Sequence, residues 1–415
     1  MTGASALGGR RFPRLDGLRA LGALMVVTTH VGFQSGDALV GPFNGLLARM
    51  DSGVAIFFVI SGFLLGRPYF VAWMSADSRP ALPGYFWHRA LRILPALWLA
   101  VLLSWLLIRP EDAAPGPYLQ HAALIQIYST DNAAYGLTQM WSLATEAAFY
   151  VALPLLGWLL TRGEPTSNRL RLVCLLLVAT PLLGATWMGF SAAYAHPLWA
   201  LWLPGFIGWF GLGMLLALWE VAMSTGRLRL GVLPNLITHR GTVWGLAVAL
   251  YFVAMSLLAG PYSLLPPTPG EAMTKSLLYS AFGFLIVLPA AFPLLDRSKV
   301  GTPDPVGRAT TFLGNISYGI FCYHLIVLKL VEAAIGHEAF RGNFVTLWTL
   351  TVAGSILVAT CSYYLIERPI IRWGRTMHRS RNTRRRDQTV TERLDPETGS
   401  ASGKADAARR RRALG

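Results

Sequence analysis

Charged residues are scarce in this sequence. Asp, Glu, Lys and Arg together make up 14% of 415 residues, whereas an average soluble domain contains about 25%. Hydrophobic residues make up 53%, and they are gathered in long blocks. This composition excludes an ordinary soluble enzyme and predicts an integral membrane protein.

Cysteine is also scarce. The chain has three, Cys174, Cys322 and Cys361, and all fall inside apolar blocks without the spacing of metal ligands. We therefore expect no disulfide, no zinc site and no other metal. A secretory signal is lacking too, since the first apolar block is long and has no small-residue cleavage site. We interpret that block as the first membrane helix.

Ten apolar blocks have about 18–23 residues each, the length needed to cross the bilayer core. They predict an all-α integral membrane protein with about ten transmembrane helices. The apolar stretch 118–128 is too short to span and is predicted to be re-entrant or interfacial. The blocks lie near 17–34, 52–70, 90–108, 139–161, 170–189, 198–219, 241–259, 273–295, 310–332 and 344–366.

The net charge of +15 raises the question of nucleic-acid binding. The distribution of Lys and Arg argues against it, because they are concentrated on alternate connections between the blocks. Before the C-terminal tail, 17 lie on one side and 5 on the other, as the positive-inside rule expects. We therefore predict that both termini are cytoplasmic and that membrane lipid, not nucleic acid, is the partner of the basic surface.

The chain changes character at about residue 375. It runs through RSRNTRRRDQ and ends in ARRRRALG, with Gly, Ser, Thr, Asp and Glu between. Such a segment buries too little apolar surface to fold. We predict a transmembrane domain over 1–374 and a basic disordered cytoplasmic tail over 375–415, which touches anionic lipid or a specific partner.

Arg19 and His30 lie eleven residues apart in the first block. In a helix they are about 20° from the same face and about 16 Å apart along the axis. An arginine near the cytoplasmic end can hold a phosphate or a carbonyl oxygen, and a deep histidine can act as general base or nucleophile. The alternative is a topology-setting arginine and a packed, hydrogen-bonded histidine.

The segment HRALRILP places His88, Arg89 and Arg92 at the cytoplasmic mouth of the third helix. Paired arginines suit phosphate or pyrophosphate groups, because their planar donors grip two oxygens at once. The alternative is simple anchoring by positive charge.

In the second helix Gly53, Gly62 and neighbouring Ser61 predict close helix packing. Ser61 is not expected to be a nucleophile, because no base lies at helical spacing.

Ser142, Glu146 and Tyr150 recur at intervals of four in MWSLATEAAFY and so share a stripe. Glu146 is expected in the outer half of the membrane, where a buried carboxylate can accept a proton from a hydroxyl. The alternative is a structural partner for an intramembrane Arg or His.

The segment GNISYGIFCYHL contains His324 and Tyr318. His324 is likewise expected in the outer half of the membrane, beside Tyr318. It belongs either to the active site or to the packing, as a hydrogen-bonded histidine.

The ordered set of motifs resembles the membrane-bound acyltransferase family 3. It consists of Arg19 with His30, then FFVISGFL, RALRILP, WSLATEAAFY, ISYGIFCYHL and IERP, and it covers about 15–370. The resemblance implies that His30 is catalytic and that Arg19 contributes to binding of the acyl donor. Two positions depart from the family pattern: Ala55 stands where an acidic residue is frequent, and Phe321 where an aromatic hydroxyl is common.

The family implies an O-acyltransferase of a bacterial cytoplasmic (inner) membrane. It would move an acyl group, expected to be acetyl, from cytoplasmic acyl-CoA to a hydroxyl of a cell-surface glycan, a lipid-linked sugar or a secreted glycosylated metabolite. Acyl-CoA is a co-substrate, and no cofactor is expected. Direct transfer and an acyl-His intermediate both remain open. We expect His30 and Glu146 to be catalytic and the substrates to contact Arg19, Arg89, Arg92, Ser142, Tyr150, Tyr318 and His324.

The alternative function is a proton-coupled multi-pass transporter, since intramembrane His, Arg and Glu also suit that role. Transporters usually contain internal repeats with interrupted helices at matching positions. No such repeat is visible in the sequence, which favours the enzyme.

Overall fold

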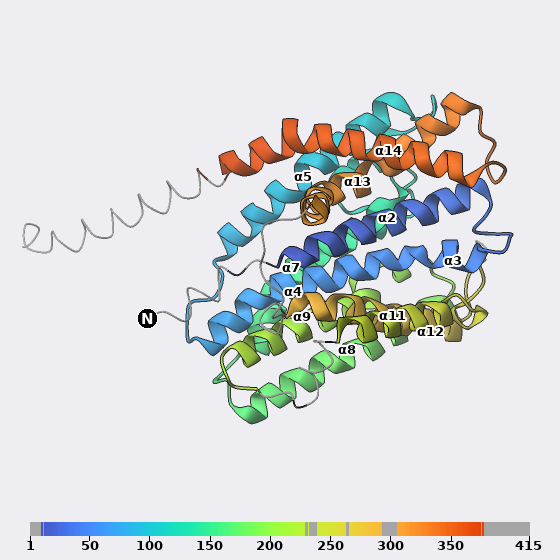
Figure 1. The fold of residues 1–415 in the computed structure, drawn as a ribbon. Coiled ribbons are helices and arrows are strands. Elements are labelled where there is room, and N and C mark those ends of the chain that lie inside the picture. Colours follow the sequence, from blue (N-terminus) through green and yellow to red (C-terminus); the bar gives the residue numbers. More distant parts are fainter. Residues whose placement is uncertain are drawn as a thin grey trace, which may run out of the picture.

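Long helices lying side by side make up the computed structural model (Figure 1). It describes residues 10, 12–228, 231, 239–262, 265–292, 305–374 and 376. Within these ranges the chain forms helices and connecting segments with no strand, so the predicted all-α class is confirmed. The basic tail, except for Thr376, lies outside the described residues.

Each of the ten apolar blocks contains a long helix, as the sequence predicts. Short elements connect some of them, including α3 (Asn44–Ala48), the 3-10 turn Arg49–Ser52 and α6 (Pro115–Ala122). The long helices are α2 (Pro13–Ser35), α4 (Gly53–Met74), α5 (Leu82–Leu107), α7 (Trp141–Leu160), α8 (Ser167–Ala193), α9 (Leu203–Ser224), α11 (Arg240–Ala254), α12 (Pro269–Ala291), α13 (Pro305–Ile335) and α14 (Phe344–Ser362).

Eight helical segments of the described chain are long and apolar enough to cross a membrane, so the chain is a multi-pass membrane protein. The other two long helices fall short of that standard. Helix α2 carries Arg14, Asp16 and Arg19 in its first two turns. Helix α11 has 15 residues and is therefore about 22 Å long, less than the bilayer core. The count of ten spans and the cytoplasmic termini stay predictions.

Helices α4 and α9 pack backbone against backbone in the centre of the bundle. A Cβ added to Gly62 would lie 2.0 Å from the carbonyl oxygen of Phe210, and one added to Gly213 would lie 2.1 Å from that of Val59. Only glycine allows this approach, which confirms the close packing predicted for the second apolar block. The ring of Phe58 stacks on that of Phe210 with centroids 4.4 Å apart.

The two ends of the bundle differ in charge. The basic end is where α2 begins, α4 ends and α5 begins, and it lies on the left in Figure 1. The opposite end is where α2 ends and where α4, α7, α9 and α12 begin.

A buried ion pair joins the helices near the basic end. Glu220 accepts from Arg67 Nε at 2.8 Å and from Arg10 Nη1 at 2.7 Å. The Glu220 side chain is only 2% exposed. Arg67 therefore has a packing role between α4 and α9 as well as its expected part in the charge bias.

Candidate active site

The two histidines singled out by the sequence contact each other. His30 comes from α2 and His324 from α13, and Nε2 of His324 lies 3.2 Å from Nδ1 of His30. Their rings are 5.1 Å apart between centroids. His324 is fully buried. Residues 294 positions apart in the chain thus form one unit deep between the helices.

The backbone around the pair determines where the ring protons lie. Nδ1 of His30 is 2.8 Å from the carbonyl oxygen of Val26, and Nδ1 of His324 is 2.8 Å from that of Phe321. A carbonyl oxygen only accepts, so each Nδ1 carries the proton in the neutral ring. Nε2 of His324 then has a lone pair facing the His30 Nδ1–H. Nε2 of His30 keeps its own lone pair, so it is the atom available to accept a proton.

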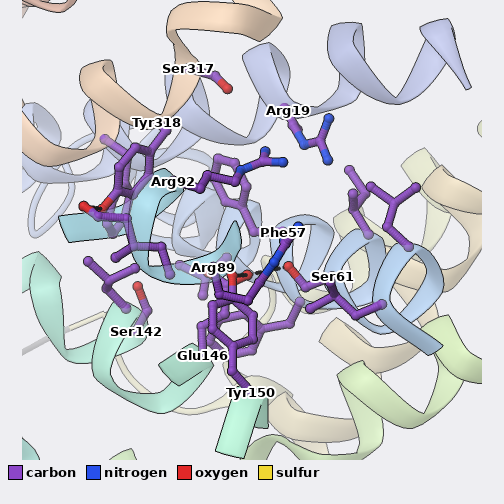
Figure 2. A pocket seen from close by; sticks show the side chains of 18 residues that line it. Arg19, Phe57, Ser61, Arg89, Arg92, Ser142, Glu146, Tyr150, Ser317 and Tyr318 are labelled. Carbon is purple, nitrogen blue, oxygen red and sulfur yellow. Dashed lines mark hydrogen bonds between the residues drawn. The ribbon is translucent and has the colours of Figure 1, made fainter. Parts of the chain in front are cut away.

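A cavity of about 160 Å³ lies among α2, α4, α5, α7 and α13. We call it the basic cavity, because Arg19, Arg89 and Arg92 project into it (Figure 2). Its polar lining also includes Ser61, Ser142, Glu146, Tyr150, Ser317 and Tyr318. The three arginines singled out in the sequence therefore line one cavity, although they come from two helices, α2 and α5.

The basic cavity adjoins a wider space of about 410 Å³, the basic mouth. Arg19, Arg89 and Arg92 line both, and Arg368 and Arg372 are added in the mouth. Asp16 and Glu367 also line the mouth, so positive charge is in excess. Five guanidinium groups in one region suit a ligand with several phosphate groups.

Arg19 is held in place from its own helix. Its Nη1 donates to the Asp16 carboxylate at 2.9 Å. At the far side of the mouth, Glu367 accepts from the Ser362 hydroxyl at 2.9 Å. Both carboxylates fix the walls of the mouth and still leave the arginines of α5 directed toward its interior.

Glu146 lines the basic cavity together with the arginines. Its carboxylate accepts from the hydroxyls of Ser61 and, at 2.8 Å, of Tyr150. It lies five residues beyond Trp141, the start of α7, and Arg92 lies ten residues beyond Leu82, or about 15 Å along α5. The cavity therefore joins a carboxylate near the opposite end of the bundle to arginines that come from the basic end. A catalytic role for Glu146 stays a prediction.

The contact between Ser61 and Glu146 could not be found from helical spacing. The two residues are 85 positions apart, on α4 and α7. The Tyr150 ring that also contacts Glu146 lies beneath Arg89, whose guanidinium carbon is 5.9 Å from the ring centroid. Ser61, Glu146, Tyr150 and Arg89 thus form one connected wall, visible in Figure 2.

Two other predicted binding residues line the cavity, and their hydroxyl groups donate hydrogen bonds to backbone carbonyls. Tyr318 donates to the Ile93 carbonyl at 2.8 Å, which ties α13 to α5. Ser142 donates to the Gln139 carbonyl at 3.3 Å. Their hydrogen bonds give them a part in holding the shape of the cavity, and their contact with a substrate stays a prediction.

An aromatic pair lies in the wall of the basic cavity, and one of its two rings lies beside His324. Phe57 and Phe321 both line the cavity, and their rings meet edge to face with centroids 6.0 Å apart. Phe321 also lies 6.1 Å from the His324 ring. Neither His30 nor His324 is among the described residues that line the cavity. His324 is therefore placed as the partner of His30, and its contact with a substrate stays a prediction.

Comparison with protein families decides the class of this site. The family model described as an acyltransferase domain matches residues 12–367. The chain belongs to this acyltransferase family. The match includes the histidine pair and every residue that lines the basic cavity, and it confirms the resemblance inferred from the ordered motifs.

Several curated proteins are similar to most of the chain. Nodulation protein 10 of Rhizobium leguminosarum is 27% identical over 86% of this chain and 92% of its own length. Peptidoglycan O-acetyltransferase OatA of Listeria monocytogenes is 24% identical over 86% of this chain but only 55% of its own length. Acyltransferase MdmB of Streptomyces mycarofaciens is 23% identical over 86% and 88%, respectively. No solved structure matches at a comparable level.

The chain is thus a multi-pass membrane acyltransferase with O-acetyltransferases among its relatives. An acyltransferase requires an acyl donor and, in an O-acetyltransferase, a hydroxyl-bearing acceptor. The family assignment favours the enzyme over the transporter considered from the sequence.

Proposed function

We propose that the protein transfers an acyl group, expected to be acetyl, from cytoplasmic acyl-CoA to a hydroxyl of a glycan, a lipid-linked sugar or a secreted glycosylated metabolite. The observation that carries the proposal is the spatial order of the basic mouth, the basic cavity and the histidine pair. A mouth with five arginines adjoins a small cavity, and a histidine pair lies beside Phe321 in the wall of that cavity.

The basic mouth fits the phosphate-rich part of coenzyme A. Arg89, Arg92, Arg368 and Arg372 would hold its phosphates with paired charge-assisted hydrogen bonds. The pantetheine arm would run inward past Arg19. The basic cavity beyond it is small and partly apolar, with Leu64, Leu65 and Val54 in its walls, which supports a short acyl group.

In the reaction the acceptor hydroxyl attacks the carbonyl carbon of the thioester. His30 Nε2 takes the hydroxyl proton, the new C–O bond forms and the C–S bond breaks. The proton then passes to the departing sulfur, so the products are an ester and the free thiol of CoA. His324 Nε2 accepts the His30 Nδ1–H throughout, which orients the base and stabilises its charged form, as the third member of a catalytic triad does.

The geometry supports direct transfer more than an acyl-His intermediate. A nucleophile must come within about 3–3.5 Å of the carbon it attacks. Phe321 lines the basic cavity and lies beside His324, and His30 is not among the described residues that line the cavity. A general base can be one atom further away, because the hydroxyl oxygen lies between it and the carbonyl carbon.

The sidedness of the reaction follows from the charge bias. The basic end carries the arginine-rich connections, so it is proposed to face the cytoplasm, where acyl-CoA is found. The acceptor would then approach His30 from the opposite end. Since OatA is named for its action on peptidoglycan, a glycan outside a bacterial cytoplasmic membrane is a natural acceptor.

The proposal is tested with purified protein in lipid nanodiscs, supplied with isotope-labelled acetyl-CoA and an extract of envelope glycans and glycolipids. We expect release of CoA thiol and label in an ester of the extract, and neither with His30→Ala. If acetyl-CoA neither binds nor is consumed by the folded wild-type protein, the proposed donor is wrong.

A further inference from the structure

A second large cavity lies at the opposite end of the bundle. It has a volume of about 570 Å³ and lies between the end of α8 and the starts of α4, α9 and α12. We call it the aromatic cavity, because Trp141, Phe206, Trp209 and Tyr279 form much of its wall. Pro197, Pro266, Pro267, Met188 and Leu201 add further apolar surface.

One edge of the aromatic cavity is polar and accessible. Lys275 Nζ lies 2.7 Å from the Asp51 carboxylate, and these side chains are 34% and 37% exposed. The Tyr279 hydroxyl donates to the other oxygen of Asp51. This edge offers a carboxylate, an ammonium and a phenol within one hydrogen-bonded group, so it can both donate to and accept from the hydroxyls of a ligand.

A further polar atom is found in the wall. His196 stacks on Trp199 with ring centroids 4.3 Å apart. Its Nδ1 is buried and has no hydrogen-bond partner within the described chain. Buried polar atoms are normally paired, so a ligand hydroxyl in the cavity would supply the missing partner.

The aromatic cavity adjoins the active site. Val54 lines both it and the basic cavity. Phe58, in the wall of the basic cavity, packs edge to face on Phe206 of the aromatic cavity with centroids 5.5 Å apart. The two cavities are thus back to back, with a partition only one layer of side chains thick.

We propose that the aromatic cavity binds the acceptor, and that the acceptor is an amphipathic glycoside. Its apolar portion would pack against Trp209 and Phe206, while its sugar hydroxyls would bond to Asp51, Lys275 and Tyr279. Binding sites of this kind combine apolar walls with a few placed polar groups. A purely hydrophilic polysaccharide would leave the aromatic wall without a partner. This inference rests on the proposed function, since it assigns the second substrate of the same reaction.

Two sources supply such a molecule: a glycolipid dissolved in the membrane and an apolar glycoside dissolved in water. Dodecyl maltoside represents the first and phenyl β-glucoside the second. Binding of each, in labelled form, is measured to protein in nanodiscs that contain no sugar lipid. Transfer of acetyl from acetyl-CoA to each is measured in parallel. If only one of the two glycosides binds, that glycoside identifies the source of the acceptor. Chitobiose, which has no apolar portion, is the hydrophilic control.

The variant Ala192→Phe places a ring inside the cavity, because Ala192 lines it. The matched control is Ala193→Phe, the adjacent residue, which is exposed and not in the lining. We expect Ala192→Phe to weaken glycoside binding and raise the acceptor KM by about tenfold or more, a change of about 1.4 kcal/mol. The KM for acetyl-CoA should stay the same, and the control should match wild type in both.

Equal glycoside binding by wild type and Ala192→Phe would overturn the assignment of the cavity. So would transfer to chitobiose with neither apolar glycoside bound. Loss of acetyl-CoA turnover with every acceptor, while glycoside binding remains sensitive to Ala192→Phe, would instead contradict the proposed reaction and leave the binding site standing.

Discussion

Nε2 of His324 lies 3.2 Å from Nδ1 of His30, and the carbonyl of Val26 lies 2.8 Å from the same Nδ1. Two acceptors therefore share one N–H, and the His30 lone pair is confined to Nε2. This relationship makes His324 a positioning residue for the proposed base.

The change His324→Phe is expected to lower kcat by about 10²-fold, because the His30 Nδ1–H loses one of its two acceptors, the one that stabilises the charged form of the base. The KM for acetyl-CoA should not change, since His324 does not line the basic cavity. His324→Gln should recover part of kcat, because its amide oxygen can accept from the same N–H. Steady-state kinetics on both variants test this, and equal losses in the two would point to a packing role alone.

Arg92→Ala is expected to weaken acetyl-CoA binding by about 10–100-fold, the usual cost of losing a hydrogen bond to a charged group. S-acetyl-pantetheine lacks the nucleotide phosphates, so its binding should change far less. The comparison is made by calorimetry on both donors. The same loss for both donors would mean that Arg92 shapes the cavity without holding phosphate.

Ser61→Ala is expected to keep most of the acyl-transfer activity, because the geometry gives Ser61 a hydrogen bond to Glu146 and no reacting role. Glu146→Ala should lose more, since it releases both Ser61 and Tyr150 and leaves Arg89 less constrained. Activity is measured with labelled acetyl-CoA. Complete loss in Ser61→Ala, with acetyl trapped on Ser61 in wild type, would make Ser61 a nucleophile.

Glu220→Ala is expected to destabilise the protein by about 3–5 kcal/mol, because it leaves the Arg67 charge buried without its carboxylate partner. The double variant Arg67→Met with Glu220→Leu should be more stable than Glu220→Ala, since it removes both charges. Thermal unfolding in nanodiscs measures both. Equal melting temperatures for wild type and Glu220→Ala would show that the ion pair contributes nothing.

The helices were predictable because a bilayer requires long apolar blocks, and each such block contains a helix. The shared face of Arg19 and His30 concerns a single helix and could be predicted from helical geometry alone. The contacts between His30 and His324, and between Ser61 and Glu146, join different helices. They depend on helix rotation and packing, which spacing along one helix does not determine. The same holds for Glu146 and Arg92, which line one cavity although they come from α7 and α5.

The most direct test of the account is the rate of CoA release by His30→Ala in nanodiscs, measured together with its affinity for acetyl-CoA. Loss of a general base costs about 10²–10⁴-fold, so turnover should fall by that factor while donor binding stays at the wild-type level, because the arginines of the basic cavity are untouched. A folded His30→Ala protein that binds acetyl-CoA normally and releases CoA at nearly the wild-type rate would remove His30 from the reaction and contradict the account.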